Sequence, residues 1–197
     1  MKNKIIKSTT YTLGIVVMLM SCNPSAEKNT TDVINSNESN EAKQLFSGVK
    51  TRLNTDEKNQ VAVLTGLSLN HTTGKFKSEG EEVDVQLMPL DIDHDKNEDL
   101  FVITYSMFLY GNTGQGFNLL MKNENGKYHS VLSLPGIPGL IYKQGNIMPD
   151  IQVGGPGFDF PIYSWKNNSY QLDRGYQLTG KVSSLDDICR TYASNLN

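Results

Sequence analysis

Alternating acidic residues followed directly by an apolar run constrain the fold more than any other feature of this chain. Four aspartates and one asparagine stand at every second position, at Asp91, Asp93, Asp95, Asn97 and Asp99. In a tight loop, alternate side chains can point to one side, so their oxygens can surround a calcium ion, which takes about six to eight oxygen ligands. Residues 100–105 are mostly apolar, with the β-branched and aromatic side chains typical of a strand. The pattern therefore predicts a calcium loop that leads into a β-strand.

Each member of the predicted loop has an expected part in holding the ion. Asp91, Asp93 and Asp95 would supply carboxylate oxygens, Asn97 its backbone carbonyl, and Asp99 a closing carboxylate. Without a cation, neighbouring carboxylates at a surface-like dielectric repel by about 4 kcal/mol per close pair. The alternative is a solvated acidic turn whose carboxylates accept hydrogen bonds from backbone amides.

The loop departs from a helix–loop–helix calcium site at two positions. Lys96 stands where the sharp bend usually requires glycine, so the lysine must adopt a positive φ or the bend must differ. Val102 stands where the last ligand of such a site is a glutamate, and a strand-like run replaces the second helix.

The sequence Asp-x-Asp-x-Asp-x-Asn-x-Asp-Leu instead resembles the calcium loop of FG-GAP/VCBS-type repeats, a β-rich extracellular family. The resemblance covers residues 91–103 well and extends loosely to Leu172. It implies that the same five residues bind calcium and that the repeats build β-propeller blades. Those repeats usually carry glycine where this chain has His94 and Lys96.

A faint internal repeat links the loop to the rest of the chain. Each copy has an aspartate-led strand, a glycine-containing gap, a second strand, a polar turn and a tyrosine, from Asp99 to Tyr128 and from Asp150 to Tyr170. Only the first copy has the acidic loop. A propeller needs about four or more blades. We therefore expect a mainly β (α+β) fold of antiparallel sheets from two degenerate strand–loop–hairpin repeats.

Hydrophobic periodicity predicts the individual elements. Short helices are expected over residues 42–49, 56–64 (with Thr55 as N-cap) and 185–192 (with Ser184 as cap). Residues 76–80 are expected in a polar connection. Strands are expected around Val83, Val85 and Leu87, and over residues 100–105, 117–121, 128–132, 150–153 and 161–165, with a hairpin turn at 123–126.

The first residues form a processing signal. Lysines precede an apolar stretch over residues 12–20, which is far shorter than the ~20 residues of a membrane-spanning helix. Leu19-Met20-Ser21-Cys22 resembles the bacterial lipoprotein cleavage box, which implies acylation of Cys22 at its sulfur and amine. The alternative is an ordinary secretory signal. We thus expect a signal peptide over 1–21, the lipidated cysteine and a flexible tether over 22–41, and one globular domain over 42–197.

Charge narrows the possible partners. Loss of the signal lysines takes the formal charge from −3 to −6, and no basic stripe remains. This excludes nucleic acid as an expected partner and leaves membrane attachment to the acyl chains. We expect a cell-envelope protein, anchored in the outer membrane and facing the periplasm, with an envelope protein or a glycan as partner.

Other candidate sites have weaker patterns. The segment 111–116 lacks the lysine of a nucleotide loop and is expected to be a long hairpin loop. With residues 154–157 it would form a rim for a ligand or partner. Aromatic anchors there would be Phe158, Phe160, Tyr163 and Trp165, although aromatic residues at period two also fit core packing. Cys189 is expected to be a small buried residue rather than a nucleophile.

Three functions follow from these patterns. The leading expectation is a non-enzymatic, lipid-anchored binding or scaffold module with one structural calcium ion. The second is an inhibitor or immunity-type lipoprotein that neutralises a partner enzyme. The third, a hydrolase using the metal, would need a nearby general base, which the sequence does not show.

Overall fold

The computed structural model describes residues 37–157, 160–175 and 181–196, which all lie in one compact unit, Asn35–Asn197. The predicted signal peptide, Cys22, most of the predicted tether and Phe158 lie outside the described residues. Among the helices that the structure describes, none combines the length and apolar character needed to cross a membrane.

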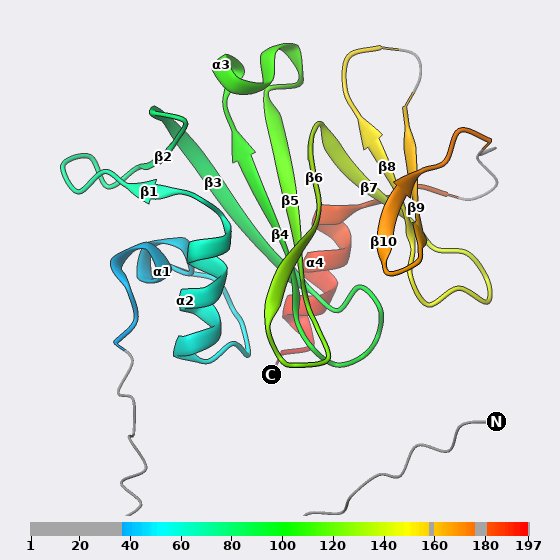
Figure 1. The fold of residues 1–197 in the computed structure, drawn as a ribbon, viewed down its shortest axis with the longest axis horizontal. Helices are drawn as coiled ribbons and strands as arrows, with labels where there is room; N and C mark the ends of the chain where they lie inside the picture. The colour runs from blue at the N-terminus through cyan, green and yellow to red at the C-terminus, as the bar shows by residue number, and fades with distance from the viewer. Residues whose placement is uncertain (1–36, 158–159, 176–180, 197) are drawn as a thin grey trace, which may run out of the picture. The chain divides into compact units, whose positions relative to one another are not determined.

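Two antiparallel sheets form the framework of the described residues (Figure 1). The first has the order β1-β2-β3-β4-β5-β6, with bounds Ser68–Leu69, Phe76–Ser78, Glu81–Leu90, Asp99–Tyr105, Gln115–Lys122 and Tyr128–Pro135. The second has the order β10-β9-β8-β7-β11, in which β7 to β11 span Ile137–Ile141, Asp150–Gly154, Ile162–Lys166, Ser169–Leu172 and Ser183–Ser184. The mainly β, antiparallel expectation is confirmed.

Strand β4 lies at the centre of the first sheet and is buried on both faces. Its side chains alternate between two apolar clusters, as the period of two in a strand requires. Leu100 and Val102 pack in one cluster with the N-terminal helices, whereas Phe101 and Ile103 pack in the other with residues of the second sheet. The apolar run after the acidic loop therefore joins both cores.

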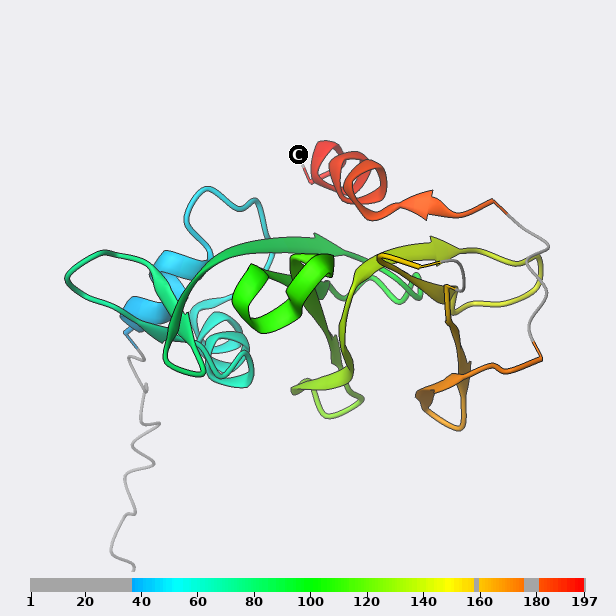
Figure 2. The ribbon, with the colours of Figure 1, turned by 90° about the horizontal axis from the view of Figure 1, so that it is seen from above.

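Helices cover the two faces of the first sheet. On one side lie α1 (Asn40–Leu45) and α2 (Thr55–Leu64), and on the other lies α4 (Leu185–Ser194), which contacts β3 and β7 (Figure 2). The short α3 (Met107–Tyr110) follows β4 at the end away from the acidic loop (Figure 1).

A single residue, Gly136, connects β6 to β7 and so joins the two sheets. Its φ is 128°, which disfavours other residues. A Cβ atom there would lie 2.4 Å from Val153 Cγ1 and 2.7 Å from the carbonyl oxygen of Gly154. Only glycine allows this close approach.

Several boundaries differ from the expectations. The N-cap of α2 is Asn54, not Thr55, because Asn54 Oδ1 accepts from Glu57 N and the Glu57 carboxylate accepts from Asn54 N. The supposed polar connection contains β2, since Phe76 is buried and pairs with Val83 of β3. The helix α1 begins at Asn40, before residue 42, and ends at Leu45.

Two further predicted segments also differ. The segment after β4 is not a plain hairpin loop. Ser106 caps α3 there through its side chain and a 3₁₀ turn spans Gly111–Thr113. Ser184 is the N-cap residue of α4, but its side chain makes no capping hydrogen bond.

Candidate metal site

Four of the five predicted ligand residues lie in the loop 91–98, which connects β3 to β4, and Asp99 is the first residue of β4. The two strands meet in the buried pair Leu90 and Asp99, which fixes both ends of the loop. Carboxylate oxygens of Asp91, Asp93 and Asp99 lie within 4.8 Å of one another. The fold thus brings three of the five predicted ligand residues to one point.

The backbone of this loop adopts the bends that glycine would favour. His94 has φ 62° and Lys96 has φ 73°, both in the left-handed region. These are the two positions where FG-GAP/VCBS-type repeats usually carry glycine. Of the two alternatives for Lys96, a positive φ or a different bend, the structure has the positive φ. Such strain persists only where the surroundings hold it, and it is concentrated at functional sites.

Backbone amides occupy one oxygen of each clustered carboxylate. Ile92 N donates to Asp99 Oδ2 at 3.0 Å, Lys96 N to Asp91 Oδ2 at 3.1 Å, and Asp95 N to Asp93 Oδ1 at 3.2 Å. An acidic turn without an ion would have the same bonds. However, Asp91 Oδ1 is buried and accepts no hydrogen bond from the described residues. A buried carboxylate oxygen without a partner is unfavourable unless a cation or donor approaches it.

The other two predicted ligand residues interact with each other. Asn97 donates from its backbone N to Asp95 Oδ1 and from its side-chain Nδ2 to Asp95 Oδ2, both at 2.7 Å. Asp95 is exposed and is not part of the clustered group. The participation of Asp95 and of the Asn97 carbonyl stays a prediction.

Burial makes the charge of Asp99 unfavourable. Its residue surface is 2 % exposed, and burial raises its pKa to about 8, with the negative charges of Asp93, Asp95 and Asp91 adding to the effect. Burial also raises the pKa of Asp93. The side chains whose charges shift the pKa of Asp99 include no cationic one. A proton or a bound cation can therefore relieve the repulsion within the cluster.

Glu98 holds the loop against the rest of the fold. It is 3 % exposed, and its carboxylate accepts from Thr51 Oγ1, from Arg52 N at 2.9 Å and from the Tyr192 hydroxyl at 3.3 Å. The Tyr128 hydroxyl donates to its backbone carbonyl at 2.7 Å. No sequence pattern singles out Glu98, because its partners lie far away along the chain.

A second loop, 142–149, connects β7 to β8 and has the same length as loop 91–98. It precedes Asp150, which is 4 % exposed and pairs with Ile141 as Asp99 pairs with Leu90. The Tyr170 hydroxyl donates to the carbonyl of Pro149 at 3.0 Å, as Tyr128 does to Glu98.

The two loops differ in what faces the buried aspartate. Lys143 Nζ lies 2.5 Å from Asp150 Oδ2, an ion pair without the alignment of a hydrogen bond. An ammonium group therefore balances the second buried carboxylate. In the first loop, the carboxylates of Asp91 and Asp93 lie near the buried Asp99 instead.

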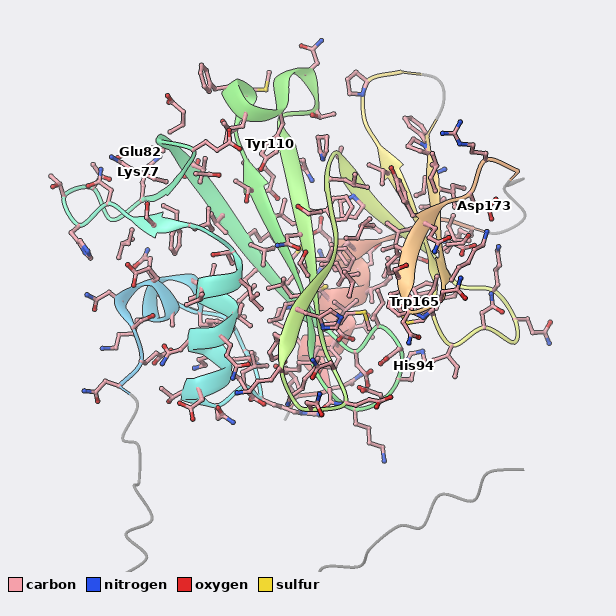
Figure 3. The ribbon with its side chains drawn as sticks, in the orientation of Figure 1. Lys77, Glu82, His94, Tyr110, Trp165 and Asp173 are labelled. Carbon is pink, nitrogen blue, oxygen red and sulfur yellow. The ribbon has the colours of Figure 1, made fainter. Side chains whose placement is uncertain are left out.

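Figure 3 shows His94 and Trp165 at the same end of the two sheets. His94 stacks on Tyr142, with ring centroids 6.2 Å apart, beside a cleft of about 630 Å³ between the acidic loop and α4. Trp165 lines a separate cleft of about 1120 Å³, as do Asp93 and Asp95. The acidic loop thus separates two clefts.

The expected rim involves two glycine-containing segments, 111–116 and 154–157. The glycine-rich segments meet, since a Cβ atom on Gly155 would lie 2.9 Å from Thr113 Cγ2. Phe160 is 44 % exposed there, whereas Tyr163 and Trp165 pack partly against the core.

Cys189 is buried, as expected, which raises its pKa to about 12 and makes its reactive thiolate scarce.

Comparisons of the chain with family models, with curated proteins and with solved structures gave no match.

Proposed function

We propose that this chain is a lipid-anchored protein of the bacterial envelope whose β-domain holds one structural calcium ion and serves as a non-enzymatic binding or scaffold module. The carrying observation is the convergence of Asp91, Asp93 and Asp99 on one point, with a buried oxygen on Asp91 that no described residue contacts by a hydrogen bond. The envelope location and the anchor rest on the lipoprotein-like segment ending at Cys22.

The ligand chemistry favours a hard cation. The three converging groups are carboxylates, which suit magnesium, calcium or manganese rather than the softer metals that thiolates select. Calcium tolerates irregular geometry and high coordination numbers, so carbonyls and water can complete the site. A loop bent by positive φ at His94 and Lys96 provides such an irregular arrangement.

The two matching strand–loop units support a common repeat origin for the sheets. Their loops have equal length, and each buried aspartate follows a carbonyl that accepts from a tyrosine hydroxyl. We extend the proposal to a pair of FG-GAP/VCBS-like units, of which only the first retains the acidic residues.

Thermal unfolding tests the calcium site. With calcium at about twentyfold above its Kd, we expect the Tm to rise by about 5 °C over the chelated protein, because a ligand of the folded state alone stabilises that state. Asp93→Ala should abolish the rise, since it removes one of the three clustered carboxylates. Differential scanning calorimetry gives the measurement.

Asp84→Ala is the matched control for this test. Asp84 lies on β3, its side chain is 75 % exposed, and it pairs with Lys75 away from the loop. Its variant should keep the full calcium response. Superimposable melting curves for the unmodified chain with chelator and with calcium would remove the calcium site from the proposal.

Exposed apolar residues favour a second candidate function, the inhibitor or immunity-type lipoprotein. At the end of β4 opposite the acidic loop, Met107 is 68 % and Phe108 77 % exposed, and Ile137 is 53 % exposed. Such exposed apolar surface marks interaction sites. Purification from detergent-solubilised envelopes should then yield a stoichiometric partner that the Phe108→Asp variant loses. Recovery of the anchored chain alone would argue against this candidate.

A further inference from the structure

A cleft of about 1120 Å³ opens beside the acidic loop. Loops 91–98 and 142–149 bound it, together with the turns that follow β5 and β9. Its volume is close to the upper end for small-molecule sites, roughly 300–1,000 Å³. Asp93 belongs both to the cleft wall and to the carboxylate group, so a cation held there would lie at the edge of the cleft.

Five asparagines stand among the polar residues that line this cleft. They come from both loops and both turns: Asn97, Asn123, Asn125, Asn146 and Asn168. Each amide has donors and an acceptor. Asn97 Nδ2 already donates to Asp95 Oδ2, and Asn123 Oδ1 already accepts from two backbone amides of its own turn. A hydroxyl group likewise donates and accepts through one oxygen. A ligand rich in hydroxyl groups is therefore complementary to this lining.

Trp165 adds an apolar surface between the amides. It lies on β9 (Figure 3) and is only partly buried. Its ring is edge-on to that of Tyr170, at a centroid distance of 5.0 Å. Ile147, also in the wall, is 69 % exposed. The flat, apolar ring of Trp165 thus lies among polar side chains. The C–H face of a sugar ring fits against such a surface while its hydroxyls reach the amides.

The charges of the cleft exclude anionic ligands. Lys122 lines it, but its ammonium lies 2.5 Å from Glu57 Oε1 and is already paired. Asp93, Asp95 and Glu124 add negative charge to the wall. Phosphate, sulfate and nucleic acid would meet repulsion there. A neutral ligand avoids it.

We infer that this cleft binds the end of a neutral saccharide chain, with a sugar ring against Trp165 and hydroxyls on the asparagines. A further hydroxyl oxygen would coordinate the cation at Asp93, because three carboxylates leave coordination positions open. That last contact rests on the proposed calcium site. The contacts to Trp165 and the amides do not.

Trp165 is the only tryptophan of the chain, so its fluorescence reports directly on the cleft. The calcium-loaded protein is titrated with neutral hexasaccharides of glucose, of mannose and of N-acetylglucosamine, and separately with hexalysine. We expect a saturable change in emission with at least one saccharide and none with hexalysine. By calorimetry, Trp165→Ala and Asn168→Ala should each weaken that binding about tenfold or more, and Trp165→Phe should restore much of the loss.

Asp84→Ala is the control, since Asp84 is exposed on β3 and pairs with Tyr105, away from the acidic loop and the cleft. This variant should bind as the unmodified chain does. Failure of every saccharide to bind, or binding of hexalysine alone, overturns the inference, and so does equal binding by Trp165→Ala.

Melting of the same samples separates this inference from the calcium proposal. A calcium-dependent rise in Tm without saccharide binding contradicts the saccharide site and leaves the calcium site supported. If saccharide binding is unchanged by chelator and calcium does not raise the Tm, the saccharide site is supported and the calcium site is contradicted. Binding that weakens about tenfold in chelator supports both.

Discussion

Calcium should bind about tenfold more tightly for each pH unit between pH 6 and pH 8, and its affinity should level off above pH 8. Burial raises the pKa of Asp99 to about 8, so this carboxyl carries a proton at neutral pH until a cation displaces it. Binding at pH 7 should therefore release about one proton. Calorimetry in two buffers of different ionisation enthalpy measures the number released.

The same group sets the stability of the chelated protein. Because the folded-state pKa of Asp99 lies above its ordinary value of 3.8, the folded state holds the proton more tightly than the unfolded state does. Stability should fall as pH rises from about 4 to about 8, by an amount on the order of a few kcal/mol, and then stay level. Urea denaturation in chelator across this range gives the measurement.

Asp99→Asn is the decisive variant for both effects. The amide keeps an oxygen for Ile92 N but carries no charge, so the chelated variant should be more stable than the unmodified chain at pH 8. It should also lose the pH dependence and the calcium response. Asp84→Asn, at an exposed position, should change neither. Calcium affinity that is constant from pH 6 to pH 8 would contradict the buried, protonated state of Asp99.

The parts of the fold with a strong local pattern could be predicted from the sequence. The period of two in Val83, Val85 and Leu87, and the unbroken apolar run after Asp99, predicted the strands that bound the loop. Alternate acidic residues predicted that carboxylates would converge, and Asp91, Asp93 and Asp99 do so. A local pattern could predict the strands and the convergence of these three carboxylates, because side-chain direction in a strand or tight loop depends mainly on neighbouring residues. The full set of five ligands stays a prediction.

Contacts between residues far apart along the chain could not be predicted from the sequence. The role of Glu98 depends on Arg52 and Tyr192, which only the folded chain brings near it. Phe76 looked like part of a polar connection, because its burial depends on pairing with Val83 and on the helices above it. In the same way, Asp95 fits the ligand spacing, but its oxygens accept from Asn97.

The matching loops show two ways to accommodate one buried aspartate. Asp99 and Asp150 occupy the same place at the start of β4 and β8, and both are almost fully buried. The second loop provides its own cation, Lys143. The first loop surrounds its aspartate with more carboxylates, so it depends on a proton or an external ion. Metal dependence should therefore be confined to the first loop.

Lys143→Met should lower the free energy of unfolding by about 2–4 kcal/mol, a loss typical of breaking a buried ion pair, reduced for partial exposure. The Asp150 side chain is 5 % exposed and would keep an unbalanced charge, while methionine preserves most of the lysine's apolar stem. The Lys143 side chain is 35 % exposed, so water can relieve part of the effect. Urea denaturation at neutral pH with saturating calcium isolates this loop from the first.

The double variant Lys143→Met/Asp150→Asn separates charge from packing. It removes the stranded carboxylate together with its cation, so it should regain most of the stability that the single variant loses. Lys166→Met, which breaks an ion pair with Asp173 whose lysine is 50 % exposed, should change stability by less than about 1 kcal/mol. If the single and double variants lose equally, the loss does not come from an unbalanced carboxylate, and the Lys143 ammonium does not replace a metal ion.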